Sequence, residues 1–196
     1  MKLAAPLFVV VFAVVLAVPL PAQQGAAPAA PAGPGFTLTI GGWPDGDDIP
    51  LKYTQAVPMP VSPALAWTNV PAGTRSFVLH FHDPDVSINK TSNDQVHWLV
   101  WGIPGTATGL SEGQPQGEKL PDGSRQVSAS GQVYRGPGAR AAGPKHHYTF
   151  ELYALDTKLD VPQGTPQQAA ATRTAVVDAM DGHVLGKAVL VARFHR

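Results

Sequence analysis

Short runs that alternate hydrophobic and polar residues dominate the chain from Phe36 onward. Residues 36–40, FTLTI, place their apolar side chains on one face and threonines on the other, the pattern of a half-buried strand. Residues 75–82 alternate in the same way, and residues 97–101 and 146–155 are rich in the aromatic and β-branched residues that favour strands. Glycine and proline, 20 of each, fall mainly between these runs and would break long helices. We therefore predict a mainly β domain.

One segment near the C-terminus has the pattern of a helix. Residues 165–168, TPQQ, supply an N-cap threonine, a proline at the first helical position and a glutamine at the third, which together form a capping box. Asp181-Gly182 then ends the helix, and residues 184–194 return to the alternation of a strand. One helical face is expected to carry Ala169, Val176, Val177 and Met180.

The N-terminus has the pattern of an export signal. An uncharged apolar run follows the initial Met-Lys pair, so we predict a signal peptide over residues 1–22, with cleavage after Ala22. Residues 23–35, QQGAAPAAPAGPG, contain nothing large enough to pack and are expected to form a flexible tether. The folded domain should then span residues 36–196. These features predict a periplasmic or secreted protein, with an uncleaved membrane anchor as the alternative.

Composition excludes several classes of function. Lys and Arg together number 14, as do Asp and Glu, so the chain lacks the basic surface that nucleic-acid binding requires. With no cysteine, it has no disulfides, no thiol nucleophile, no thiolate metal ligand and no cysteine for a lipid anchor. Four tryptophans remain, of which Trp67, Trp98 and Trp101 are expected in the core and Trp43, within a turn, at the surface.

The candidate chemistry is that of histidine. Asp83-Pro84-Asp85 follows directly on a predicted strand, where a rigid turn would hold two carboxylates at the strand end. His146 and Tyr148 are two residues apart on another strand and share a face. Upstream of them, Gly136-Pro137-Gly138 could let backbone N–H groups approach a ligand, and together with histidines such donors suit an anion. The histidines are His80, His82, His97, His146, His147, His183 and His195.

Six short motifs follow one another along the chain. They are SPALAW (62–67), VPAGTRSF (70–77), DPD (83–85), HW (97–98), GP (136–137) before HHY (146–148), and LYAL (152–155). In this order they resemble the phosphatidylethanolamine-binding protein family, and most closely its bacterial, Raf-kinase-inhibitor-like branch. The resemblance covers essentially residues 36–196. It implies a core of antiparallel sheets arranged like a β-sandwich, a few peripheral helices, and a small pocket for phosphate-like groups.

Carried over to this chain, the resemblance implies a ligand pocket lined by Asp83, His97, Gly136, Pro137, His146 and Tyr148. Two histidines and the tyrosine hydroxyl would donate hydrogen bonds to an oxyanion, with further donors from the loop N–H groups. The chain departs from the family pattern in three places. The usual His-Arg-Tyr is His146-His147-Tyr148, the DPDAP motif is DPDVS (83–87), and the proline-rich stretch after Gly136-Pro137 is Gly138-Ala139-Arg140.

We predict a non-enzymatic binding protein with no cofactor, no catalytic residue and no metal site. Its expected partner is a phosphate-bearing small molecule or lipid headgroup, while a protein partner or a homodimer stays open. One alternative is a protein-interaction or inhibitor module on the same fold. Another is a metal hydrolase in which His80 and His82, on one strand face, share an ion with His97.

Overall fold

A computed structural model describes residues 35–196 of the chain. The predicted signal peptide, and the tether apart from Gly35, lie outside these residues. The elements follow the predicted strand-rich order and are β1 (Thr37–Ile40), η1 (Leu51–Tyr53), β2 (Leu65–Thr68), β3 (Ser76–Asp83), β4 (Gln95–Pro104), β5 (Gly109–Leu110), β6 (Arg125–Val127), β7 (His146–Leu155), η2 (Pro166–Gln168), α1 (Ala169–Met180) and β8 (Val184–Phe194).

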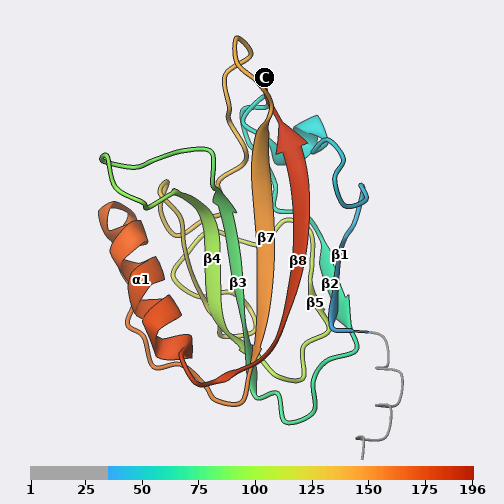
Figure 1. Ribbon diagram of the computed structural model, residues 1–196, viewed down its shortest axis with the longest axis vertical. Coiled ribbons are helices and arrows are strands. Elements are labelled where there is room, and N and C mark those ends of the chain that lie inside the picture. The colour runs from blue at the N-terminus through green and yellow to red at the C-terminus, as the bar shows by residue number, and fades with distance from the viewer. Residues whose placement is uncertain (1–34) are drawn as a thin grey trace, which may run out of the picture. The chain divides into compact units, whose positions relative to one another are not determined.

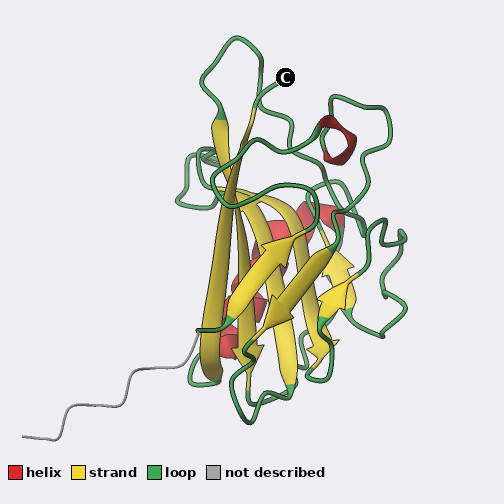
Figure 2. Cartoon of the chain, turned by 90° about the vertical axis from the view of Figure 1, so that its right-hand side faces the viewer, coloured by secondary structure: helices red, strands yellow, loops and turns green. Residues whose placement is uncertain are grey.

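The strands form two antiparallel sheets. The larger has the order β6-β4-β3-β7-β8 and the smaller the order β1-β2-β5. The small sheet faces one side of the large sheet (Figure 2), and α1 covers the other side (Figure 1). The predicted mainly β, antiparallel fold is confirmed, with one α-helix and two 3-10 turns among residues 35–196. None of the helices in this range is long and apolar enough to cross a bilayer.

The main core lies between the two sheets. Because β3 alternates, Phe77, Leu79 and Phe81 all point to this side, and each is fully buried. Phe150 of β7 stacks on Phe81 with ring centroids 3.8 Å apart. The predicted burial of Trp67, Trp98 and Trp101 is confirmed. Trp43 does not lie at the surface as predicted: only 7% of it is exposed, because its ring packs against Tyr53 at 5.0 Å and completes one end of this core.

A second, smaller core lies between the large sheet and α1. The predicted capping box is present between Thr165 and Gln168, and the first helical turn is the 3-10 turn η2. The helix buries Ala169, Thr172, Val176 and Met180 against the sheet. Val177, which was predicted on this face, is 40% exposed. The buried residues are spaced three or four positions apart, and Val177 does not fit this spacing. It therefore lies at the edge of the buried face of the helix.

A β-bulge in β4 decides which way its histidine points. Phe81 of β3 pairs with Trp98, but His82 pairs with Val96, so His97 is an extra residue in the ladder. Without the bulge, His97 would stand opposite His82 on the same face. Instead its ring lies 5.4 Å from that of Phe81, on the inner side. The hypothesis that His80, His82 and His97 share one ion is therefore wrong, because the sheet separates His97 from the other two.

Replacing Phe150 by alanine should lower the free energy of unfolding by roughly 3–5 kcal/mol, because it opens a cavity beside the stacked ring of Phe81. The matched control is Val189→Ala on the neighbouring strand β8. Its side chain is 47% exposed, and its loss should cost below about 1 kcal/mol. Urea denaturation measures both values. Equal effects of the two substitutions would contradict the assignment of the core.

Candidate functional site

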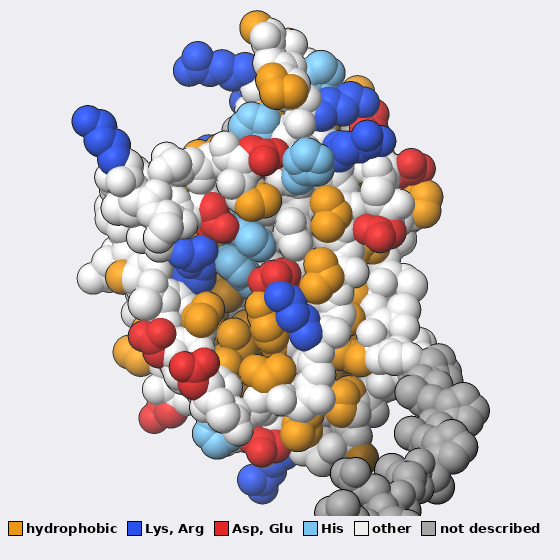
Figure 3. Space-filling view, viewed as in Figure 1, with side chains coloured by type: hydrophobic (Ala, Val, Ile, Leu, Met, Phe, Trp, Pro, Cys, Tyr) orange, Lys and Arg blue, Asp and Glu red, His pale blue; other side chains and the backbone are white. Residues whose placement is uncertain are grey.

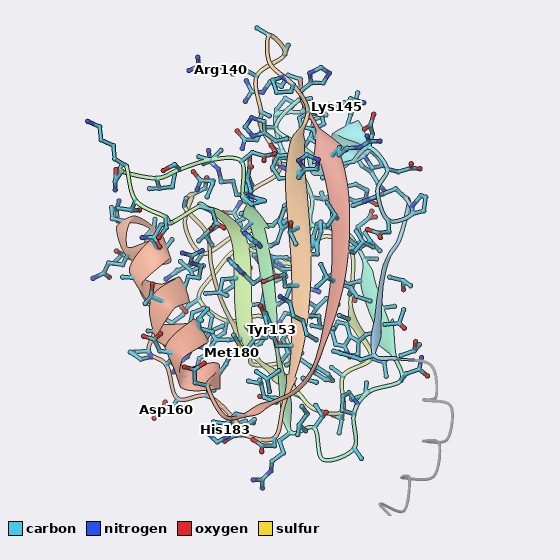
Figure 4. The ribbon with its side chains drawn as sticks, in the orientation of Figure 1. Arg140, Lys145, Tyr153, Asp160, Met180 and His183 are labelled. Atoms are coloured by element: carbon cyan, nitrogen blue, oxygen red, sulfur yellow. The ribbon has the colours of Figure 1, made fainter. Side chains whose placement is uncertain are left out.

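A cavity of about 550 Å³ opens at the end of the sandwich where β3 ends and β7 begins. The loop that precedes β7 forms part of its rim, with Arg140 at the outer end of that loop (Figure 4). Four of the six predicted ligand-binding residues, Asp83, His97, His146 and Tyr148, line this cavity together. Gly138 of the expected ligand-approaching loop lines it too. The lining residues that had not been predicted are Gln55, Val86, Gln95, Arg135, Ala139, Arg140, Ala142 and Gly143.

The pairing of β3 with β7 brings Asp83 and His146 into contact. Asp83 is the last residue of β3 and His146 the first of β7, and these strands are antiparallel neighbours. The His146 Nδ1 lies 2.8 Å from Asp83 Oδ2, while the backbone N–H of Asp85 donates to Asp83 Oδ1 at 3.0 Å. Burial raises the pKa of Asp83, and the contact with His146 opposes this shift. With Nδ1 directed at the carboxylate, the second ring nitrogen of His146 is the one left for a ligand.

His97 is held as a neutral ring. Its Nδ1 lies 2.9 Å from the carbonyl oxygen of Arg135, and since a carbonyl only accepts, Nδ1 carries the proton. Burial lowers the pKa of His97 to about 4. The other nitrogen, Nε2, is therefore a hydrogen-bond acceptor at neutral pH. The expectation that this histidine donates to an oxyanion is not compatible with that tautomer.

The hydroxyl oxygen of Tyr148 accepts hydrogen bonds from the backbone of the loop that precedes β7. The N–H groups of Gly138 and Ala139 both donate to its hydroxyl oxygen, at 3.3 and 3.1 Å. Burial, together with the nearby carboxylate of Asp83, raises the pKa of Tyr148 to about 12. The Gly138 N–H, which had been expected to bind a ligand, and the Ala139 N–H instead fasten the loop to β7.

Gly136 and Pro137 lie outside the lining set. A Cβ atom at Gly136 would come within 2.7 Å of the Tyr53 carbonyl oxygen, so glycine is needed here for close packing against another loop. Gln55 completes this contact: its Nε2 donates to the Gly136 oxygen at 2.7 Å, and its backbone N–H donates to the Pro137 oxygen at 2.8 Å. The Gly-Pro motif thus positions the wall of the cavity.

Sequence patterns did not indicate two side-chain donors around this cavity, Gln55 and Arg135. Gln55 lies about 80 positions from the loop that it binds, and nothing local marks it. Arg135 precedes the Gly-Pro motif directly. Its Nη1 donates to Ser130 Oγ at 2.5 Å, while its Nε is buried without a hydrogen-bond partner among residues 35–196. Such an unsatisfied cationic donor is costly and favours an anion nearby.

The same end of the sheet also holds a group of possible cation ligands. Asp83, Asp85 and His146 each offer one ligand atom, all within 4.8 Å of one another. Asp85 is already engaged, since its Oδ2 accepts from the backbone N–H of His147 at 2.7 Å and lies 3.0 Å from the Nδ1 of that residue. These contacts lock the DPD turn to the start of β7. The arrangement therefore combines fixed acceptors with arginine and histidine donors.

Fold and cavity together define a two-sheet β protein with a polar pocket at the ends of two central strands. The family model described as phosphatidylethanolamine-binding protein matches residues 40–195. The chain belongs to the phosphatidylethanolamine-binding protein family.

Similar proteins come from several lineages. A UPF0098 protein of Methanothermobacter thermautotrophicus is 40% identical over 154 residues, which cover 78% of this chain and 93% of that protein. LppC of Mycobacterium tuberculosis, named as a candidate lipoprotein, is 33% identical over 84% of this chain and 75% of its own length. The crystal structure of Escherichia coli YbcL superposes with a TM-score of 0.68 at 26% identity, covering 83% of this chain and 99% of that one. These relatives support the bacterial branch of the family.

The protonation of His97 should appear as a pH dependence of stability. Its pKa is about 4 when folded against 6.5 for an ordinary histidine, so the unfolded chain binds more protons between these values and stability falls as the pH drops through them. From about pH 7 to about pH 5, this one group should remove about 2 kcal/mol of unfolding free energy. His97→Asn keeps an N–H donor for Arg135 but does not titrate. Urea denaturation at both pH values should show a smaller loss in the variant, and equal losses would contradict the buried, neutral ring.

Proposed function

We propose that this chain is a non-enzymatic binding protein whose cavity holds a small phosphate-bearing molecule or a phospholipid headgroup. The observation that carries the proposal is that one cavity is lined by the cationic side chain of Arg135 together with the acceptors Asp83 and His97. The guanidinium attracts an anion, and a protonated His146 would add a second cationic donor from Nε2.

The acceptors narrow the class of ligand. A fully deprotonated oxyanion has no proton to donate. The Asp83 carboxylate would repel it, and it could form no hydrogen bond with the His97 Nε2. A phosphate that keeps one proton can donate it to either acceptor, and an ethanolamine phosphate can donate from its ammonium group. We therefore propose a ligand that brings both a negative charge and a hydrogen-bond donor.

The state of the lining residues argues for binding rather than catalysis. Tyr148, with a pKa of about 12 and two N–H groups bound to its oxygen, is a poor acid and a poor nucleophile at neutral pH. His97 is tied to the Arg135 carbonyl. No serine, threonine or lysine is among the residues that line the cavity. The side chains present can hold and orient a phosphate group, and none is activated to attack it.

We also propose that the protein acts outside the cytoplasm. The signal-peptide pattern of residues 1–22 supports export. The resemblance to LppC, named as a candidate lipoprotein, points the same way. Any surface attachment in this chain would differ from a cysteine-linked lipid anchor, because the sequence has no cysteine.

The decisive experiment compares the affinities for phosphate and for sulfate at about pH 6. Both are measured by NMR titration of the full chain. The two anions are similar in size, but sulfate carries no proton to give to Asp83 or His97. Phosphate should bind at least about tenfold more tightly, since a hydrogen bond to a charged group is worth about 1.5–3 kcal/mol. Asp83→Asn should reduce this preference, and His146→Asn should weaken the binding of phosphate itself.

The matched control is His183→Asn, which changes an exposed histidine outside the cavity lining. It should leave both affinities unchanged. O-phosphoethanolamine and glycerophosphoethanolamine, tested in the same way, separate a free phosphate ester from a lipid headgroup. Equal affinities for phosphate and sulfate, or no saturable shift of the cavity residues at millimolar ligand, would overturn the proposal.

A further inference from the structure

A second polar cluster lies on the opposite face of the large sheet, in a groove of about 320 Å³ beside α1. His80 and His82 of β3 form its floor, with Glu151 of β7 next to them and Arg173 of α1 above. Figure 3 shows histidine side chains in a hollow of this face, bordered by charged groups of both signs, and Figure 4 places Tyr153 on the same face. The side chains of His80 and His82 are only 7% and 12% exposed.

The histidines lie at distances that hydrogen bonds do not explain. His80 Nδ1 is 3.6 Å from Glu151 Oε2, and His82 Nε2 is 3.9 Å from the same oxygen, both too long for a hydrogen bond. Two ligand atoms that share a tetrahedral ion through bonds of about 2.05 Å are about 3.3 Å apart. Glu151 Oε2 thus lies within a few tenths of an ångström of that separation from each of the two imidazole nitrogens.

Unsatisfied nitrogens mark the same place. The Nε2 atoms of His80 and His82 are both buried without a hydrogen-bond partner among residues 35–196. The rings stack almost parallel, with centroids 4.2 Å apart and planes 5° apart. Leaving two such nitrogens bare in the interior is costly unless something binds them.

The flanking carboxylates are positioned by cations on their outer sides. Asp94 accepts from Arg173 Nη1 through Oδ1 at 2.6 Å and presents Oδ2 to His82 Nδ1 at 2.5 Å. Glu151 accepts from Lys187 through Oε1 at 2.5 Å, and its Oε2, which accepts from the Tyr153 hydroxyl at 2.7 Å, also faces both histidines. In each carboxylate a cation holds one oxygen in place and the other oxygen faces the imidazoles, which is how outer partners orient metal ligands.

We propose that His80 and His82, with carboxylate oxygens from Asp94 and Glu151, form a binding site for a divalent transition metal ion. His80, His82 and Asp94 each offer one ligand atom within 4.8 Å of the others. Two imidazole nitrogens with carboxylate oxygens are a donor set that suits zinc and its neighbours in the first transition row. The two rings must rotate from their parallel stack to reach one ion. The site is structural, since it ties β3 and β7 to the segment between β3 and β4 and, through Arg173, to α1.

This site is independent of the phosphate-binding proposal. The large sheet lies between the two clusters, and no residue of the metal cluster lines the 550 Å³ cavity. Failure of the metal-site proposal would therefore leave the phosphate-binding proposal intact. Failure of the phosphate-binding proposal would equally leave the metal site intact.

The test is a titration of the purified, EDTA-treated full chain with ZnCl₂ by calorimetry. The stoichiometry should be one, with a Kd of about 1 μM or tighter. His82→Asn and Asp94→Asn should each weaken binding by about tenfold or more. Co²⁺ offered in place of zinc should give the visible absorption of a low-coordinate cobalt site, and zinc should raise the melting temperature of the parent chain but not of these variants.

Two control variants make the result specific. His183→Asn removes an exposed histidine that also contacts an aspartate, with 2.8 Å between His183 Nδ1 and Asp156 Oδ1, but has no second histidine beside it. His146→Asn disables the cation ligands at the cavity end. Both should bind zinc as the parent chain does. If His82→Asn fails to fold by circular dichroism, Asp94→Asn and Glu151→Gln decide the matter. Absence of saturable zinc binding, or its loss in either control rather than in the cluster variants, would overturn the proposal.

Discussion

The bulge in β4 is the constraint on which the chemistry of this molecule depends. A strand places successive side chains on opposite faces, and one inserted residue reverses that assignment for everything beyond it. Here the insertion falls at His97, so His97 and Trp98 both point toward the inner core and cavity, while Val96 opposite His82 remains on the α1 side. Four of the five histidines on these three adjacent strands thereby lie in two clusters of different character, with His80 and His82 on the α1 side and His97 and His146 at the cavity.

The two clusters differ because the layers that cover them differ. At the cavity, the small sheet ends short of the β3 and β7 termini, so loops cover the inner face, and loops carry backbone polar groups that must be satisfied. The Gly138 and Ala139 N–H groups find that partner in Tyr148. On the other face, α1 satisfies its own backbone and offers only side chains. The histidines beneath it must therefore find partners among one another, the carboxylates and Arg173.

Alternation and capping were enough to predict the long strands and the helix, because each of these buries a complete face. The short strands β2, β5 and β6 span two to four residues, too few to show a period. Trp43 was misplaced because its burial depends on Tyr53 and Phe150, which are distant in sequence. Strand position and spacing indicated Asp83, His146 and Tyr148, and the family resemblance placed them with His97 in one pocket. The protonation states could not be predicted in this way, because the neutral His97 follows from a carbonyl 38 positions away that only the folded chain brings near.

The fastening of the loop before β7 explains why this pocket is rich in acceptors. In many anion sites, backbone N–H groups supply the donors. Here Tyr148 has taken two of them, and the Gly136 and Pro137 carbonyls are bound by Gln55. What remains for a ligand is set by side chains: the Asp83 carboxylate and the His97 nitrogen as acceptors, and the Arg135 guanidinium as cation. Under the proposed function, a pocket of this composition would discriminate between ligands by where they carry their protons as much as by their charge, because each unsatisfied buried acceptor opposes binding.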